Sequence, residues 1–166
     1  MAKADLTAER LREFLHYDPE TGVFIWMKRP GQHNNICIGT VAGNISCSGY
    51  IRIGIRGRVW QAHRLAWLYI NGSWPKGVID HINGNKADNR AANLRDVTHQ
   101  SNLENLRSAR RDNRIGLLGV SPHGSGFRAQ IMLNGANHHI GTYPTPDLAH
   151  NAYIEAKRRL HVCSTI

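Results

Sequence analysis

The stretch from residue 78 to residue 110 constrains the fold more than any other part of the chain. A short apolar run at 78–82 ends at Asn83-Gly84, a dipeptide that favours tight turns. A polar, asparagine-rich stretch then leads to a second short run at 93–97, and Thr98 follows as a candidate N-cap. The pattern predicts a strand, a loop, a strand and a helix that runs toward residue 110.

Asp80 and His81 lie side by side in the first of these strands. Hydrolysis of a phosphodiester needs a base that deprotonates water and a cation that neutralises charge on the phosphate. A carboxylate and an imidazole supply both kinds of group, although neighbours in a strand point to opposite faces and need a twist or a strand end to converge. The amide oxygen of Asn102, on the predicted helix, is a candidate second ligand for a hard cation.

The remaining chain divides around this segment. Before it, apolar spacing predicts a helix within residues 6–17, a strand at 23–26, a hairpin over 49–62 and a helix at 63–71. After it, three strands at 117–121, 127–133 and 137–143 precede a final helix that ends near residue 161. We therefore expect an α+β chain with an N-terminal helix and strand segment (1–48), a central core (49–110) and a C-terminal three-stranded sheet with one helix (111–166).

Charge and composition narrow the function classes. The formal net charge is +9, and the excess of basic side chains lies entirely after residue 50, which suits binding to a phosphate backbone. The longest apolar run, 65–70, is far shorter than the roughly 20 residues of a membrane-spanning helix. The three cysteines are odd in number and scattered, which favours a reducing compartment. They include no Cys-x-x-Cys pair, which argues against a thiolate zinc site. We expect an intracellular protein with no membrane association.

Four stretches of the sequence resemble one known family. Residues 80–95 (DHINGNKADNRAANLR) and 101–105 (SNLEN) resemble the motif of HNH endonucleases, in the form that phage homing endonucleases use. Residues 17–26 and 63–67 resemble other parts of the same phage proteins. The resemblance implies a ββα-metal nuclease core, a divalent metal (Mg²⁺ or Mn²⁺) as cofactor, double-stranded DNA as partner, and a phage gene expressed in a bacterial host.

The resemblance also implies a role for each motif residue. His81 is the general base, Asp80 and Asn102 are the metal ligands, and Asn93 is the central asparagine that ties the long loop down and helps to hold the base. The third position is Asn102 rather than the histidine for which the motif is named, a substitution that is typical of the homing branch. The resemblance also implies that the DNA products carry 5′-phosphate and 3′-hydroxyl ends.

The C-terminal segment resembles a second family. Residues 119–121, 127–131 and 139–143, with Ala149, Ala152 and Tyr153, resemble an APETALA2-type DNA-binding domain, in which a three-stranded sheet backed by a helix reads the major groove. The sheet here carries fewer Arg and Trp residues than that family places on its DNA face. The side chains that we expect to contact DNA are Arg52, Arg56, Arg58, Arg64, Arg128, Gln130, Asn137 and His138.

Three functions remain open at this point. The first is a metal-dependent DNA endonuclease that nicks as a monomer or cuts both strands as a homodimer or in two events. The second is a sequence-specific DNA-binding protein that keeps the nuclease fold without turnover. The third is a nuclease that acts on branched DNA or RNA, against which the C-terminal sheet argues.

Overall fold

The computed structural model describes residues 6–31, 36–105, 109 and 113–161. The fold is α+β, as predicted, and the chain divides into two compact units, Met1–Asp96 and Val97–Ile166. Each unit has its own hydrophobic core. The division into 1–48, 49–110 and 111–166 stays a prediction.

The first unit begins with a helix and a hairpin. Helix α1 (Ala8–Phe14) starts at Thr7, whose side chain accepts a hydrogen bond from the backbone of Arg10. It ends earlier than the expected range, because residues 15–18 form strand β1 (Leu15–Asp18), which pairs with β2 (Val23–Trp26). Strand β1 alternates buried and exposed side chains, which is a strand pattern that the overlapping helical spacing concealed.

The predicted hairpin and second helix are confirmed. Strands β4 (Ile51–Ile55) and β5 (Arg58–Gln61) form the hairpin, the short strand β3 (Asn44–Ile45) adds to its edge, and helix α2 (Ala62–Asn71) follows directly. Arg56 and Gly57 both have positive φ at the hairpin turn, 51° and 76°.

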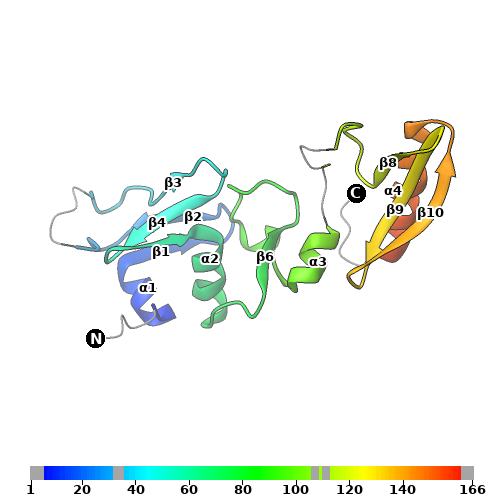
Figure 1. Cartoon of the computed structure of the whole chain (residues 1–166). Helices are drawn as coiled ribbons and strands as arrows, with labels where there is room; N and C mark the ends of the chain where they lie inside the picture. Colours follow the sequence, from blue (N-terminus) through cyan, green and yellow to red (C-terminus); the bar gives the residue numbers. More distant parts are fainter. Residues whose placement is uncertain (1–5, 32–35, 106–108, 110–112, 162–166) are drawn as a thin grey trace. The chain divides into compact units, whose positions relative to one another are not determined.

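One core joins these elements. Apolar side chains from α1, β1, β2, β4 and α2 pack together, and Leu11, Leu15, Ile53 and Leu65 are fully buried. Helices α1 and α2 contact each other, as Figure 1 shows. No helix among the residues that the structure describes has the length and apolar character to span a membrane.

The predicted strand, loop, strand and helix are also confirmed. Strand β6 (Val78–His81) pairs with β7 (Leu94–Val97), and a single 3₁₀ turn, η1 (Ala91–Asn93), ends the loop between them. Helix α3 (His99–Glu104) starts at Thr98, whose side chain accepts a hydrogen bond from the backbone of Ser101. Helix α3 stops at Glu104, so it is shorter than predicted.

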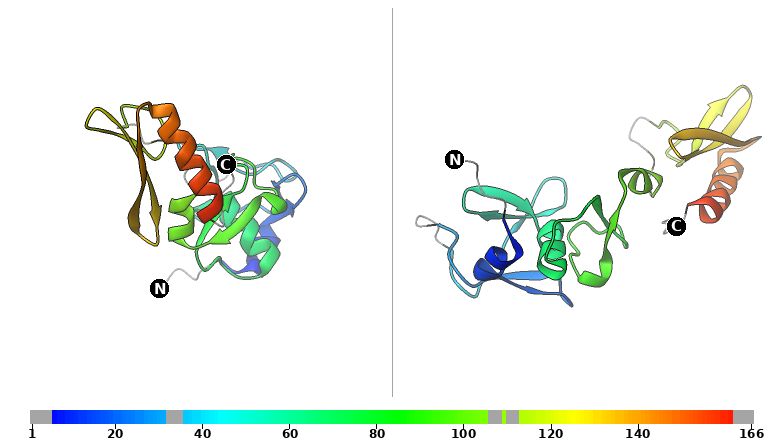
Figure 2. Two further views of the ribbon diagram at one scale, coloured as in Figure 1. Left: turned by 90° about the vertical axis from the view of Figure 1, so that its right-hand side faces the viewer. Right: turned by 90° about the horizontal axis from the view of Figure 1, so that it is seen from below.

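The second unit contains the predicted three-stranded sheet. Strand β9 (Gly126–Leu133) lies between β8 (Val120–His123) and β10 (Ala136–Tyr143), and all pairs are antiparallel. Helix α4 (Pro146–Leu160) covers one face of this sheet, as Figures 1 and 2 show. Ala129, Ile131, Ala149 and Tyr153 are buried between the helix and the sheet.

Candidate active site

His81 is the last residue of β6 and is almost fully buried, with 5% of its surface exposed. Its Nε2 atom lies 3.4 Å from the amide Oδ1 of Asn89, a residue that sequence reasoning did not select. The rings of Tyr50 and His63 pack against it, with centroids at 6.0 and 5.1 Å. Burial lowers the pKa of His81, because it disfavours the charged imidazolium.

His63 is the second histidine of this cluster. It lies on α2, is 4% exposed, and its Nδ1 atom is buried with no hydrogen-bond partner among the described residues. Burial, together with smaller effects of the nearby His81 and Arg64, lowers the pKa of His63 to about 4. His63 is therefore neutral at pH 7, so it places no positive charge beside His81.

Asn93 ties the two ends of the long loop together. Its Oδ1 accepts a hydrogen bond of 2.9 Å from the backbone of Asn83, and its Nδ2 donates one of 2.8 Å to the carbonyl of Asp88. The backbone carbonyl of Asn93 accepts a further hydrogen bond from the backbone of Ile82, immediately after His81. The side chain thus holds the loop against the end of the strand that carries the histidine.

Asp80 pairs with an arginine that sequence reasoning did not select. The Nε and Nη2 atoms of Arg95, on the neighbouring strand β7, donate to Asp80 Oδ2 over 2.9 and 2.6 Å. Both side chains are mostly buried, with 14% and 24% exposed for Asp80 and Arg95. A charge-assisted pair of this kind is strong, so a cation at Asp80 must share the carboxylate with the guanidinium.

The oxygen donors present suit a hard divalent cation. Asp80 offers a carboxylate and Asn102 an amide oxygen, both of which are ligands that Mg²⁺ and Mn²⁺ prefer. Within the described ranges no three His, Cys, Asp or Glu side chains cluster. Asn102 lies on α3, in the second unit, with its side chain half-buried. That Asn102 and Asp80 bind the same metal ion stays a prediction.

Two of the expected DNA-contacting arginines stack on tryptophans. Trp60 and Trp74 are stacked with centroids 4.9 Å apart, the guanidinium of Arg58 lies 4.2 Å from the Trp60 ring, and that of Arg64 lies 5.7 Å from the Trp74 ring. Stacking restricts both guanidiniums while leaving their edges able to donate hydrogen bonds. The other two arginines expected in this unit, Arg52 on β4 and Arg56 in the hairpin turn, are exposed.

The expected contacts of the second unit divide between the two faces of its sheet. Register places Gln130 opposite His139 and Ile131 opposite His138, and directly paired residues share a face. His138 therefore lies on the face of Ile131, which α4 covers, whereas His139, which was not selected, lies with Gln130. Arg128 is on the Gln130 face as well, and its guanidinium contacts the imidazole of His123.

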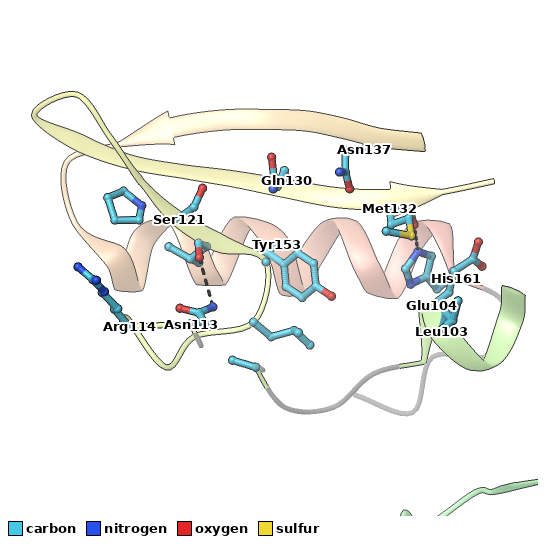
Figure 3. Close-up of a pocket in the computed structure, with 15 residues that line it drawn as sticks. Leu103, Glu104, Asn113, Arg114, Ser121, Gln130, Met132, Asn137, Tyr153 and His161 are labelled. Carbon is cyan, nitrogen blue, oxygen red and sulfur yellow. Dashed lines mark hydrogen bonds between the residues drawn. The ribbon is translucent and has the colours of Figure 1, made fainter. Parts of the chain in front are cut away.

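Gln130 and Asn137 line an open cavity in this unit. Its volume is about 600 Å³, and Tyr153 and His161 also line it (Figure 3).

Comparison with known proteins identifies the central part of the chain. Residues 61–107 match the HNH endonuclease family, and this range includes His81, Asn93 and Asn102. The chain contains an HNH endonuclease domain. The match covers β6, β7 and α3, so the HNH domain contains the ββα core that was predicted.

Two relatives extend the HNH similarity beyond this range. DNA endonuclease I-HmuI of Bacillus phage SP01 is 39% identical over 74 residues, which are 42% of this chain and 42% of the relative. The uncharacterised HNH endonuclease L560 of Acanthamoeba polyphaga mimivirus is 34% identical over 95 residues, 56% of this chain and 49% of the relative. The chain thus spans less than half the length of each relative. No solved structure matches the chain significantly.

Proposed function

We propose that the chain is a divalent-metal-dependent DNA endonuclease of the homing type, in which His81 deprotonates the attacking water. The observation that carries the proposal is the buried, oriented His81 beside Asp80 within an HNH domain. The Nδ1 atom of His81 makes no hydrogen bond to any part of the chain that the structure describes. That nitrogen is the one that can accept a proton from water.

The protein groups divide the work between them. His81 takes the proton, and Asn93 holds the loop and the strand end that fix its place. Asp80 and Asn102 would hold the metal, which when bound supplies positive charge against the scissile phosphate and the leaving oxygen. Arg95 limits the negative charge at Asp80 and fixes the orientation of its carboxylate.

Basic side chains of both units support DNA as the substrate. Arg52, Arg56 and the stacked Arg58 and Arg64 would contact phosphates, which sets register without reading sequence. We propose that the second unit is an APETALA2-type module whose exposed sheet face reads bases. That face carries Arg128 and Gln130, and register adds Asn137 and His139 to it. Gln130 and Asn137 also line the open cavity.

The relatives bear on the biological setting. One of them is named a DNA endonuclease and comes from a Bacillus phage. We accordingly propose that this chain is phage-encoded and acts on double-stranded DNA inside a bacterial host. With one candidate site per chain, a monomer nicks, and a homodimer or two successive events are needed for a double-strand break.

One observation favours a second candidate function. The ion pair between Asp80 and Arg95 already neutralises the candidate metal ligand. A chain in which this pair never opens would bind DNA without cutting it. Such a protein is the sequence-specific DNA-binding alternative.

Cleavage of supercoiled plasmid separates the two functions. The substrates are plasmids that carry phage DNA fragments, with Mg²⁺, Mn²⁺ or EDTA, and the proteins are the wild type, His81→Ala and the control His16→Ala. His16 is an exposed imidazole on β1. We expect the wild type and His16→Ala to convert supercoiled DNA to open or linear forms only when metal is present. His81→Ala should lose this cleavage activity by orders of magnitude, but it should still shift DNA in a gel. DNA binding by all three proteins without cleavage under any metal would establish the binding protein instead.

A further inference from the structure

Asn89 is the most deeply buried polar side chain near His81. Only 1% of its surface is exposed. Its Nδ2 donates to the carbonyl of Ala87 over 3.3 Å, which settles which end of the amide is oxygen. Its Oδ1 therefore faces His81 Nε2, and an amide oxygen can only accept a hydrogen bond. This contact requires the proton of neutral His81 to reside on Nε2.

Asn89 is held in place from a distant part of the chain. The hydroxyl of Tyr17, on β1, donates a buried hydrogen bond of 2.7 Å to the backbone carbonyl of Asn89. Tyr17 is itself 2% exposed and packs against Phe24 and Tyr69 in the core. Burial raises the pKa of Tyr17 to about 12, so its hydroxyl keeps the donated proton at any pH at which the protein is used.

The turn of the same hairpin closes on the next residues of the loop. The backbone of Ala91 donates to the carbonyl of Pro19 over 2.9 Å. Gly22, with φ of 73°, leaves so little space that an added Cβ would lie 2.4 Å from the backbone nitrogen of Arg90. The β1–β2 hairpin, which lies outside the HNH match, thus holds the loop at Asn89 and at the two residues that follow it.

The geometry points to Asn89 as a positioning residue, anchored by Tyr17, that sets the tautomer of His81 so that Nδ1 is free of its proton and faces water. The distance of 3.4 Å is long for a hydrogen bond, as is common before substrate is bound. The catalytic consequence rests on the proposed function, whereas the tautomer itself is a property of the protein alone. The wrong tautomer would present N–H rather than a lone pair to the attacking water.

Long-range ¹H–¹⁵N NMR spectra test the tautomer without DNA or metal. The full chain is labelled with ¹⁵N-histidine and measured at pH 8, where His81 is neutral, and its signals are assigned by their loss in His81→Ala. We expect the wild type to carry the His81 proton on Nε2. Asn89→Ala should give a mixture of tautomers, whereas Asn89→Asp should restore the wild-type pattern because it keeps an acceptor oxygen.

Tyr17→Phe tests the anchor, and Tyr69→Phe is its matched control. Tyr69 belongs to the same aromatic cluster, and its hydroxyl makes no hydrogen bond to the described residues. Tyr17→Phe should shift His81 toward mixed tautomers, and Tyr69→Phe should not. A wild-type protein with the proton on Nδ1 would overturn the inference, as would a His81 tautomer that Asn89→Ala leaves unchanged.

Single-turnover cleavage measures the effect on the reaction. Loss of a group that holds a reacting side chain typically lowers activity by about 10- to 100-fold, and we expect that loss for Asn89→Ala, with a smaller one for Tyr17→Phe. The Kd for DNA should stay unchanged in both variants, because neither side chain is a DNA contact. Equal rates for Asn89→Ala and wild type would contradict the positioning role. A wild type that cuts no DNA while its His81 shows the expected tautomer would refute the proposed function alone.

Discussion

His63 makes the stability of the first unit depend on pH in a predictable way. In the unfolded chain its pKa is the ordinary 6.5, and in the folded unit burial lowers this pKa to about 4. Between these values the unfolded state binds more protons than the folded state. The contribution of His63 is therefore fully present above pH 6.5 and is lost as the pH falls toward 4.

The size of the loss follows from the shift. Each pKa unit corresponds to about 1.4 kcal/mol, so the free energy of unfolding should fall by about 2 kcal/mol between pH 7 and pH 5, and by about 3 kcal/mol at pH 4. Solvent screening reduces this little, because His63 is only 4% exposed. A loss of this size is a large fraction of the stability of a small domain, which is roughly 5–15 kcal/mol in total.

Urea unfolding followed by tryptophan fluorescence measures the first unit alone. All four tryptophans of the chain, Trp26, Trp60, Trp67 and Trp74, lie in that unit. The comparison is between the wild type and His63→Phe, which keeps a ring against Tyr50 and His81 without a titrating nitrogen. The difference in free energy of unfolding between the two proteins should change by about 2 kcal/mol from pH 7 to pH 5. Parallel pH profiles for the two proteins would show that His63 is not held neutral by burial.

Three further changes probe the hairpin clamp, the ion pair and the DNA surface. In chemical unfolding, Gly22→Ala should destabilise the first unit much more than the control Gly57→Ala. Both glycines have positive φ, which alone costs an alanine about 1–2 kcal/mol, but of the two only Gly22 lacks space for a Cβ. Arg95→Gln should lower the Tm measured without metal, because Asp80 loses its ion-pair partner. Mg²⁺ should then raise the Tm of this variant more than that of the wild type, because the cation neutralises Asp80. An equal rise in Tm in both proteins would place the metal elsewhere. Arg64→Ala should weaken binding to unrelated DNA duplexes alike and reduce the salt slope in fluorescence anisotropy by about 0.9, whereas an unchanged slope would remove Arg64 from the phosphate contacts.

Local patterns along the chain were sufficient to predict the HNH core. The β6–β7 pair and α3 were predicted because their boundary signals are local. The Asn83-Gly84 turn follows the first strand within a few residues, and the Thr98 cap directly precedes the helix. Strand β1 was missed because Leu11, Phe14 and Leu15 fit helical spacing, and only pairing with β2 decides between helix and strand there. Tertiary pairing overrides local spacing where the two conflict.

The partners of the site residues were harder to predict. Each partner is distant in sequence from the group that it contacts. Arg95 lies 15 residues from Asp80, and Asn89 and His63 lie 8 and 18 residues from His81. Tyr17 lies 72 residues from Asn89. A motif states which residue types recur, but not which side chain closes a hydrogen bond across the core. Arg95 had a usable signal, since it lies in the strand predicted to pair with that of Asp80, and opposite charges on paired strands attract.

The surroundings of His81 suit a base that is neutral at rest and charged after it acts. Burial is the largest influence on its pKa and lowers it, so the ring is ready to accept a proton at neutral pH. Asp80 and Asp88 act in the opposite direction, as does the contact with Asn89, and all three stabilise the imidazolium once the proton is taken. A cation bound at Asp80 would cancel part of that support, which lowers the pKa of His81 further and keeps the resting base unprotonated. Metal binding and proton transfer would therefore be coupled through Asp80, and Asp88, held by Arg90 and Asn83 rather than by a metal, would remain as the charge that stabilises the protonated ring.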